Sequence, residues 1–213
     1  MKSLTDHELA ARLALDIPDG AYVNLGIGKP TYVSSYVPAD REVLYHSENG
    51  IIGVGPTPDL GEEDAELIDA SKRLITVAPG AAFFDHPESF AIMRGGHIDI
   101  AVLGAYQVAE NGDLANWATM DEKFPPAVGG AMDLVVGVPQ IFVMMSHVNK
   151  DGSPKVLKRC TYPLTGLGVV NRIYTDLAVL EVTADGFRLV ELAPGNSLEE
   201  VQSVTEARIL PPA

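Results

Sequence analysis

Four short apolar runs constrain the fold of this chain more than any other feature. Strands that are buried on both faces are almost uninterrupted in apolar residues, whereas strands with one wet face alternate apolar and polar residues. Three of the four runs are of the uninterrupted kind, which predicts an α/β fold with an open, mostly parallel sheet flanked by helices. Asp185-Gly186 follows the last run and precedes another strand-like segment, so we also expect an antiparallel hairpin late in the chain. The runs are Leu74–Val77, Ile98–Leu103, Ile141–Met145 and Leu177–Val182.

The N-terminal part of the chain combines a helix signal with a glycine turn. Thr5 and Glu8 match a capping box, and apolar residues recur every four positions from 9 to 17, which predicts an amphipathic first helix. A short strand over 21–25 then runs into Gly26-Ile27-Gly28-Lys29-Pro30, where Pro30 suits the first position of a second helix. Backbone N–H groups at such a junction can bind an anion, and a merely tight turn explains the same residues equally well. The spacing matches neither a dinucleotide fingerprint nor a P-loop.

A second strand, expected over 43–46, delivers an acidic side chain into the segment HSENGIIGVGP at 46–56. Glu48 follows the strand at once, and Asn49-Gly50 comes directly after it. Glycines in this position often allow backbone to approach a ligand closely. The alternative is a tight turn with a solvated glutamate, and the local pattern does not separate the two. Residues 57–69, rich in Pro, Gly, Asp and Glu, predict a surface loop that leads into a helix.

The charge of the chain argues against two large classes of partner. Its 213 residues carry a formal net charge of −14, and no cluster of five or more Lys and Arg occurs. Nucleic acids and anionic membranes bind chiefly to positive charge, so we expect neither as a partner. A polyanionic small molecule would need a local Lys or Arg to offset the acidic surface.

Composition predicts one globular domain over residues 1–213, because 46% hydrophobic residues suffice for a sizeable core and no repeat or Gly/Ser linker divides the chain. Cys160 is the only cysteine, which excludes an intrachain disulfide and a Cys-based zinc cluster and fits a cytoplasmic location. We expect no signal peptide and no membrane span, because no apolar stretch approaches about eighteen residues.

The chemistry-bearing residues leave a carboxylate as the main candidate. G-x-S-x-G is missing, so a hydrolase elbow has no support, and His46-Ser47-Glu48 matches only half of a zinc deaminase signature that also needs two cysteines. His86 and His97 lack the spacing of metal ligands. A glutamate can attack an activated acyl carbon to form an anhydride, which suits acyl or CoA transfer and needs oxyanion donors and shielding from water. General base catalysis by Glu48 is the other use that the sequence leaves open.

Several long motifs, in order along nearly the whole chain, show a family resemblance. The chain resembles the B subunit of the class I, two-subunit CoA-transferases that act on 3-oxo acids. The motifs are YVNLGIGKPT at 22–31, HSENGIIGVGP at 46–56, MRGGHIDIAVLGAYQV at 93–108, GGAMDL at 129–134, CTYPLTG at 160–166 and RIYTDLAVLEVT at 172–183.

The resemblance implies roles for particular residues. The family's nucleophile, which forms the anhydride and then a glutamyl-CoA thioester, matches Glu48, and its CoA-contacting asparagine matches Asn24. A lysine that pairs with CoA matches Lys72, although Ser71-Lys72 replaces the Gly-Lys common in relatives. The oxyanion N–H matches Gly129 or Gly130, where Ala127-Val128 departs from the usual preceding G-M. We expect further CoA or substrate contacts from the two glycine turns, through Gly26, Gly28, Asn49 and Gly50.

The resemblance also implies a partner and a substrate class. The family's A subunit supplies its own CoA-binding segment and part of the oxyanion hole, so we expect an A/B or A2B2 hetero-oligomer, with no metal and no cofactor, CoA thioester being a substrate. The segments LANW, PAVGGAMDL and TYPLTG look most like the branch in which succinyl-CoA donates CoA to 3-oxoadipate, and acetoacetate is the alternative acceptor. A non-catalytic CoA-binding protein and an acyl-CoA hydrolase are the competing functions. Candidate cations for the second carboxylate of the acceptor are Lys29, Arg94, Lys123 and Arg172.

Overall fold

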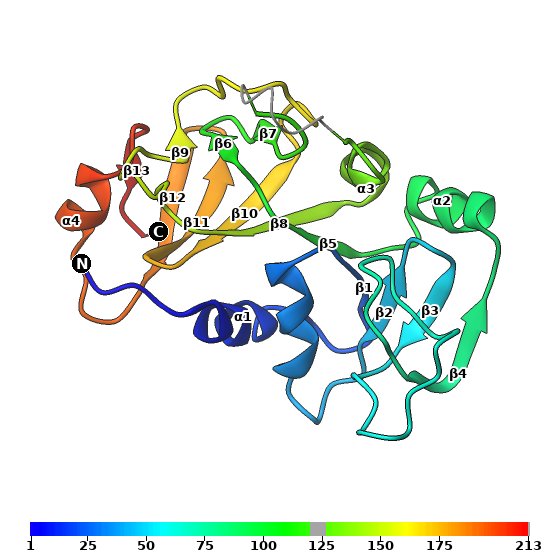
Figure 1. The fold of residues 1–213 in the computed structure, drawn as a ribbon. Helices are drawn as coiled ribbons and strands as arrows, with labels where there is room; N and C mark the ends of the chain where they lie inside the picture. Colours follow the sequence, from blue (N-terminus) through cyan, green and yellow to red (C-terminus); the bar gives the residue numbers. More distant parts are fainter. Residues whose placement is uncertain (120–126, 213) are drawn as a thin grey trace.

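The computed structural model describes residues 1–119 and 127–212, and a single large sheet dominates this part of the chain (Figure 1). The strand order is β13-β12-β11-β10-β8-β5-β1-β2-β3-β4, in which the central block from β10 to β2 is parallel. This confirms the expected open, mostly parallel α/β sheet. The strands are β1 (Tyr22–Leu25), β2 (Leu44–Ser47), β3 (Ile51–Val54), β4 (Val77–Phe83), β5 (Ile100–Leu103), β8 (Gln140–Met145), β10 (Val170–Thr175), β11 (Ala178–Thr183), β12 (Gly186–Leu192) and β13 (Ile209–Leu210).

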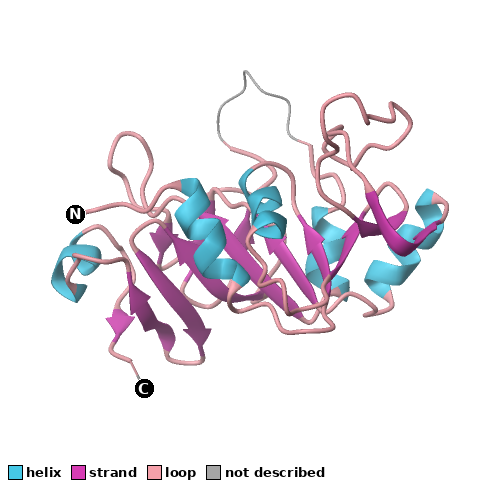
Figure 2. Cartoon of the chain, turned by 90° about the horizontal axis from the view of Figure 1, so that it is seen from below, coloured by secondary structure: helices cyan, strands magenta, loops and turns pink. Residues whose placement is uncertain are grey.

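Helices and a small second sheet cover the two faces of the large sheet (Figures 1 and 2). The small sheet has the order β7-β6-β9. The covering elements are α1 (Asp6–Ala14), the 3₁₀ helix η1 (Lys29–Ser35), α2 (His86–Arg94), α3 (Ala131–Gly137), α4 (Leu198–Ser203), β6 (Gln107–Ala109), β7 (Leu114–Ala115) and β9 (Val156–Leu157).

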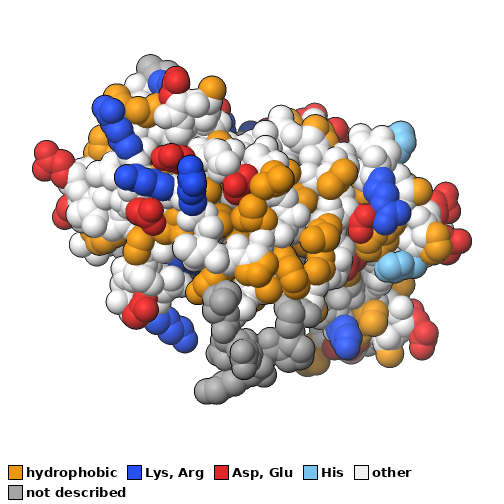
Figure 3. Space-filling view, turned by 90° about the horizontal axis from the view of Figure 1, so that it is seen from above, with side chains coloured by type: hydrophobic (Ala, Val, Ile, Leu, Met, Phe, Trp, Pro, Cys, Tyr) orange, Lys and Arg blue, Asp and Glu red, His pale blue; other side chains and the backbone are white. Residues whose placement is uncertain are grey.

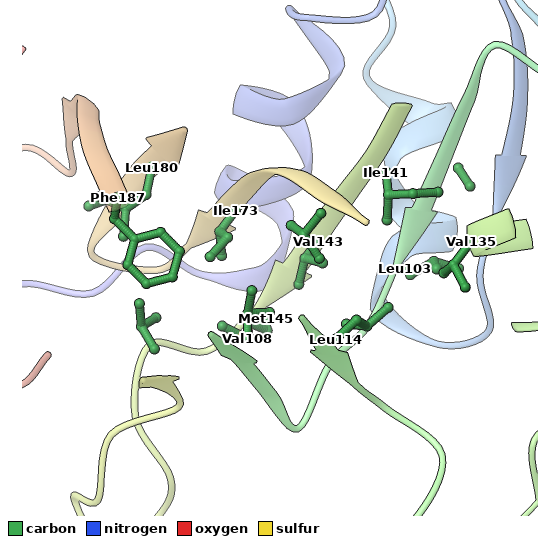
Figure 4. Close-up of a cluster of buried hydrophobic side chains, with 14 of the residues drawn as sticks. Leu103, Val108, Leu114, Val135, Ile141, Val143, Met145, Ile173, Leu180 and Phe187 are labelled. Carbon is green, nitrogen blue, oxygen red and sulfur yellow. The ribbon is translucent and has the colours of Figure 1, made fainter. Parts of the chain in front are cut away.

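The central strands bury both of their faces, as their apolar runs predict. Along β8, Ile141, Val143 and Met145 belong to one core cluster, while Phe142 and Met144 belong to the other. The first cluster extends to Leu114 and Phe187 and is drawn in Figure 4. The second packs against α1 and η1. Alternate side chains of one strand therefore support two different layers of the molecule.

Antiparallel pairs flank the parallel block on both sides, and the edge strand β13 pairs parallel with β12. The hairpin of β11 and β12 around Asp185-Gly186 is confirmed. The antiparallel meander β2-β3-β4 was not expected from the sequence. The strand predicted at 74–77 is wrong for most of its length, because β4 begins only at Val77. β4 contains Pro79 and Gly80, which obscure a strand pattern but are tolerated on the edge strand that β4 forms.

Two of the expected helices are also corrected. The segment after Pro30 is a 3₁₀ helix of seven residues rather than an α-helix. The loop at 57–69 leads into no helix: among the residues described between Gly55 and Thr76, the regular pairing is the isolated bridge of Ile68 with Leu74. The Asp69 carboxylate accepts hydrogen bonds from the N–H groups of Ser71 and Arg73, and such local bonds compete with helix formation. The predicted capping box at Thr5 is formed, and Ser197 forms a second one at the start of α4.

Candidate active site

A cavity of about 550 Å³ lies at the carboxyl edge of the parallel block. Four neighbouring strands each contribute their last residue and the residue after it: Leu25 and Gly26 at β1, Ser47 and Glu48 at β2, Leu103 and Gly104 at β5, and Met145 and Ser146 at β8. Ligands of open α/β sheets bind outside the carboxyl ends of the strands. The sequence motifs far apart in the chain therefore meet here because parallel strands end at one edge.

The turn between β2 and β3 presents Glu48 to this cavity. The N–H of Gly50 donates to the carbonyl of Ser47 at 3.0 Å and closes the turn. Gly50 has φ 114°, and a Cβ at this position would collide with the carbonyl oxygen of Phe84. The turn therefore requires glycine for both reasons. Its function is to fix the backbone on which Glu48 stands.

The Glu48 carboxylate is half-buried and electrostatically perturbed. Burial raises its pKa, His86 acts in the opposite direction, and Asp133 adds to the increase. Asp133 itself is held by Arg94 through an ion pair of 2.6 Å between α2 and α3. A desolvated carboxylate with a raised pKa is more basic and more nucleophilic than one in water. The environment of Glu48 suits either a nucleophile or a general base.

The backbone of Gly130 lies directly against the Glu48 carboxylate. A Cβ built on Gly130 would overlap Glu48 Oε2 and lie 3.1 Å from its Cδ. Gly129 and Gly130 both line the cavity, and Gly130 is the N-cap of α3. Within the part of the chain that the structure describes, their N–H groups donate to no other backbone group. The two glycines are thus positioned where backbone donors could face an oxygen bound at Glu48.

Asn24 is fixed by a buried histidine that the sequence motif did not explain. Its Nδ2 lies 3.0 Å from His46 Nδ1, and His46 Nε2 lies 3.0 Å from Ser89 Oγ. Burial lowers the pKa of His46 to about 4, so the ring is neutral at pH 7. A neutral imidazole accepts at Nδ1 from the Asn24 amide and donates from Nε2 to Ser89. His46 therefore orients Asn24, which lines the cavity.

The structure brings together only some of the predicted site residues. Glu48, Asn24, Gly26, Gly129 and Gly130 all line the cavity.

Four other predicted contacts, Gly28, Asn49, Gly50 and Lys72, are not among the residues that line it. The Asn49 amide donates instead to the carbonyl of Ile68, and Lys72 is exposed with φ 63°. Lys72 lies two residues after Ala70, which does line the cavity and whose backbone N–H donates to Ser47 Oγ. Contacts of these four residues with CoA stay predictions.

The candidate cations for the second carboxylate of the acceptor also differ in whether they line the cavity. Lys29 lines the cavity, whereas Arg94 forms an ion pair with Asp133. Arg172 forms an ion pair of 3.0 Å with Asp16, which lies two residues beyond the end of α1. Lys123 lies outside the described residues. Lys155, the residue directly before β9, is a buried residue of the cavity that the sequence did not indicate. No local motif marks it, because its position depends on the packing of the small sheet on the large one.

Comparison with known proteins assigns this arrangement to a family. The family model described as coenzyme A transferase matches residues 7–203. The chain belongs to the coenzyme A transferase family. It is an enzyme subunit of class I, B type.

Named relatives agree with the family assignment, and a solved structure agrees with the fold. The chain is 56% identical over 204 residues to the B subunit of 3-oxoadipate CoA-transferase from Pseudomonas putida, covering 96% of this chain and 95% of that one. It is 50% identical over 196 residues to the B subunit of succinyl-CoA:3-ketoacid coenzyme A transferase from Helicobacter pylori, covering 92% and 94%. The fold matches the acyl-CoA transferase YdiF of Escherichia coli O157:H7 with a TM-score of 0.76 at 21% identity, over 98% of this chain and 42% of that chain.

Two properties of the described residues bear on the chemistry of this CoA-transferase chain. No group of three or more His, Cys, Asp or Glu side chains within them could hold a metal ion. No helix formed by them is long and apolar enough to cross a membrane.

Proposed function

We propose that this chain carries the nucleophile of a CoA-transferase that moves CoA from succinyl-CoA to a 3-oxo acid, with 3-oxoadipate as the preferred acceptor. The observation that carries the proposal is Glu48, a half-buried carboxylate with a raised pKa, in a cavity where the Gly130 backbone lies against it. The acceptor is suggested by the name of the Pseudomonas putida relative. Acetoacetate is the second candidate, since the relative from Helicobacter pylori acts on 3-keto acids by name.

The chemistry needs no proton transfer. A Glu48 oxygen attacks the thioester carbon of succinyl-CoA, the C–S bond breaks, and CoA leaves as the thiolate while a mixed anhydride forms. The thiolate then attacks the Glu48 carbonyl carbon, which releases succinate and leaves a glutamyl-CoA thioester. The acceptor carboxylate repeats the two steps in reverse. N–H groups of Gly129 and Gly130 would stabilise the oxyanion at each addition.

We also propose that an A-type subunit completes the site. Met132 and Val136 stand one turn apart on α3, directly after Gly130, with 42% and 82% of their surface exposed. Leu167 is 75% exposed, and Figure 3 shows apolar side chains gathered across the middle of one face. Exposed apolar surface of this kind is typical of protein interfaces. A partner seated on α3 would lie beside Glu48 and could contribute the rest of the oxyanion hole.

Trapping the thioester tests the proposal. The chain is coexpressed with its A-type subunit, mixed with succinyl-CoA, reduced with borohydride and digested for mass spectrometry. We expect Glu48 to be found as the alcohol, and Glu48→Gln to remove both this product and CoA transfer while the pair stays folded. Initial rates with 3-oxoadipate and acetoacetate should be ping-pong and should rank the two acceptors. Release of CoA to water at the same rate with and without an acceptor would identify a hydrolase instead.

A further inference from the structure

Lys155 is a buried ammonium group inside the cavity without a carboxylate partner among the described residues. Only 8% of its surface is exposed, and its Nζ lies 3.4 Å from the hydroxyl of Ser146. None of the ion pairs within 4.0 Å in the described part of the chain includes it. Burial of a charge is costly unless an opposite charge compensates it. An anion supplied from outside the chain would provide that compensation.

Lys29 lines the same cavity but does not share this property. Its Nζ forms an ion pair of 2.7 Å with Asp6, and its side chain is 47% exposed. The charge of Lys29 is thus already neutralised within the chain and screened by solvent. Lys158 is exposed, lies three residues from Lys155 and is not among the residues that line the cavity, so it serves as the control for Lys155.

Glu48 and Lys155 line the same cavity but are carried by different parts of the fold. Asp176 acts on the charge of Lys155, but the two groups form no ion pair within 4.0 Å. Glu48 follows β2 and the Ser146 contact of Lys155 follows β8, and these strands are separated by β1 and β5. Three strand spacings of about 4.8 Å place the two strand ends about 14 Å apart.

We propose that Lys155 binds the distal carboxylate of a dicarboxylic acyl group whose thioester carbon lies at Glu48. The inference rests on the proposed function and names the substrate class of that site. A succinyl group places its second carboxylate about 4 Å from the thioester carbon, at bond lengths of about 1.5 Å. With an attack distance of about 3 Å at Glu48 and a hydrogen bond of about 2.8 Å at Lys155, this length fits between side chains that reach inward from the two strand ends.

The same cation could instead contact a phosphate of CoA. The two sources differ in a measurable way, because a phosphate contact serves every acyl-CoA equally, whereas a carboxylate contact serves only dicarboxylic acyl groups. Lys155 shares the cavity with Glu48 and its ammonium is buried, which favours an acyl group enclosed in the cavity over a phosphate exposed to solvent. The phosphate contact is therefore an outcome of the test below.

The test compares Lys155→Met with Lys158→Met in the coexpressed pair with the A-type subunit. Formation of glutamyl-CoA is followed with succinyl-CoA and with acetoacetyl-CoA, which lacks a second carboxylate. A hydrogen bond to a charged group corresponds to a loss of about 10- to 100-fold when it is removed. We expect this loss in kcat/KM for succinyl-CoA, mostly through KM, in Lys155→Met alone, with acetoacetyl-CoA changed less than about threefold.

Free acids provide a second measurement that does not depend on turnover. Succinate should compete with acyl-CoA more strongly than butyrate in the wild-type pair, and the difference should vanish in Lys155→Met. Lys155→Gln replaces Lys155→Met if the latter shifts the unfolding midpoint.

Three results would overturn the inference. Equal losses with both thioesters would assign Lys155 to a CoA phosphate, and no loss with either would leave it a structural residue. Failure of the wild-type pair to form a thioester on Glu48 with either substrate would refute the proposed function, and the inference with it.

Discussion

Gly130→Ala adds one methyl group at the N-cap of α3, where the space is already occupied by the Glu48 carboxylate. The added Cβ would overlap Glu48 Oε2 and would lie 3.3 Å from Phe90 Cζ, so the flexible end of Glu48 is the part that yields. The φ angle of Gly130 is −80°, which alanine adopts without strain. The substitution therefore moves the Glu48 carboxylate, the proposed nucleophile, without disturbing the turn that carries it.

The size of the effect follows from this geometry. Carbon and oxygen atoms in unstrained contact are separated by about 3.5 Å, so the carboxylate has to move by about 1 Å or more. A misplacement of about 1 Å in a reacting group can lower the rate about 100-fold, which corresponds to about 3 kcal/mol in the activation barrier. We expect kcat/KM for CoA transfer to fall by this factor, and the free energy of unfolding to change by about 1 kcal/mol or less.

The matched control is Gly104→Ala. Gly104 lines the same cavity, and a Cβ there would meet no atom within 4 Å. Steady-state CoA transfer and urea unfolding are measured for both variants of the paired enzyme. Wild-type activity in Gly130→Ala would show that the carboxylate does not need its position beside Gly130. An equal loss in Gly104→Ala would show that cavity volume, rather than contact with Glu48, is what matters.

Two further predictions concern stability. Gly50→Ala should lower the free energy of unfolding by about 3 kcal/mol or more in urea titrations, since Gly50 has φ 114° and its methyl would strike a backbone carbonyl. Gly61 has φ 91° but faces open space, so Gly61→Ala should lower it by only about 1–2 kcal/mol. Equal losses in the two variants would refute the carbonyl contact as the cause. Burial lowers the pKa of His147 to about 4, whereas a histidine of the unfolded chain titrates near about 6.5. Between these pH values the unfolded chain binds a proton that the folded chain does not, so the free energy of unfolding should fall by on the order of 3 kcal/mol from about pH 6.5 to pH 4. His46 contributes in the same direction, so urea unfolding of His147→Gln should show about half of the wild-type pH dependence, and an unchanged dependence would contradict this reasoning.

Local sequence patterns predicted those elements whose energetics are local. The capping box predicted at Thr5 formed because side chains and backbone groups three residues apart satisfy each other. The hairpin at Asp185-Gly186 formed because the turn type demands residues that tolerate positive φ, and Gly186 has φ 108°. The buried strands of the parallel block followed from their apolar runs. Glu48 was indicated as a candidate catalytic residue by an equally local pattern, a carboxylate between a strand and a glycine turn.

Patterns failed where distant contacts set the conformation. The strand predicted at 74–77 meets β4 only at Val77, because an edge strand needs no continuous apolar run. The helix expected after the loop at 57–69 is not formed, and the Asp69 carboxylate accepts local backbone hydrogen bonds there, which compete with a helix. The pairing of His46 with Asn24 joins residues 22 positions apart, and no periodicity records it.

The sequence by itself determined the α/β class and the family and indicated a candidate nucleophile, because burial periodicity, turn chemistry and an ordered set of motifs are all written in neighbouring residues. Only the tertiary structure decided which groups surround that nucleophile. Gly130 meets Glu48 across 82 positions of the chain, and Lys155 enters the cavity from a small sheet packed on the large one. The physical reason is that parallel strands end at one edge of the sheet, so residues far apart in sequence share a cavity whose composition is fixed by strand order.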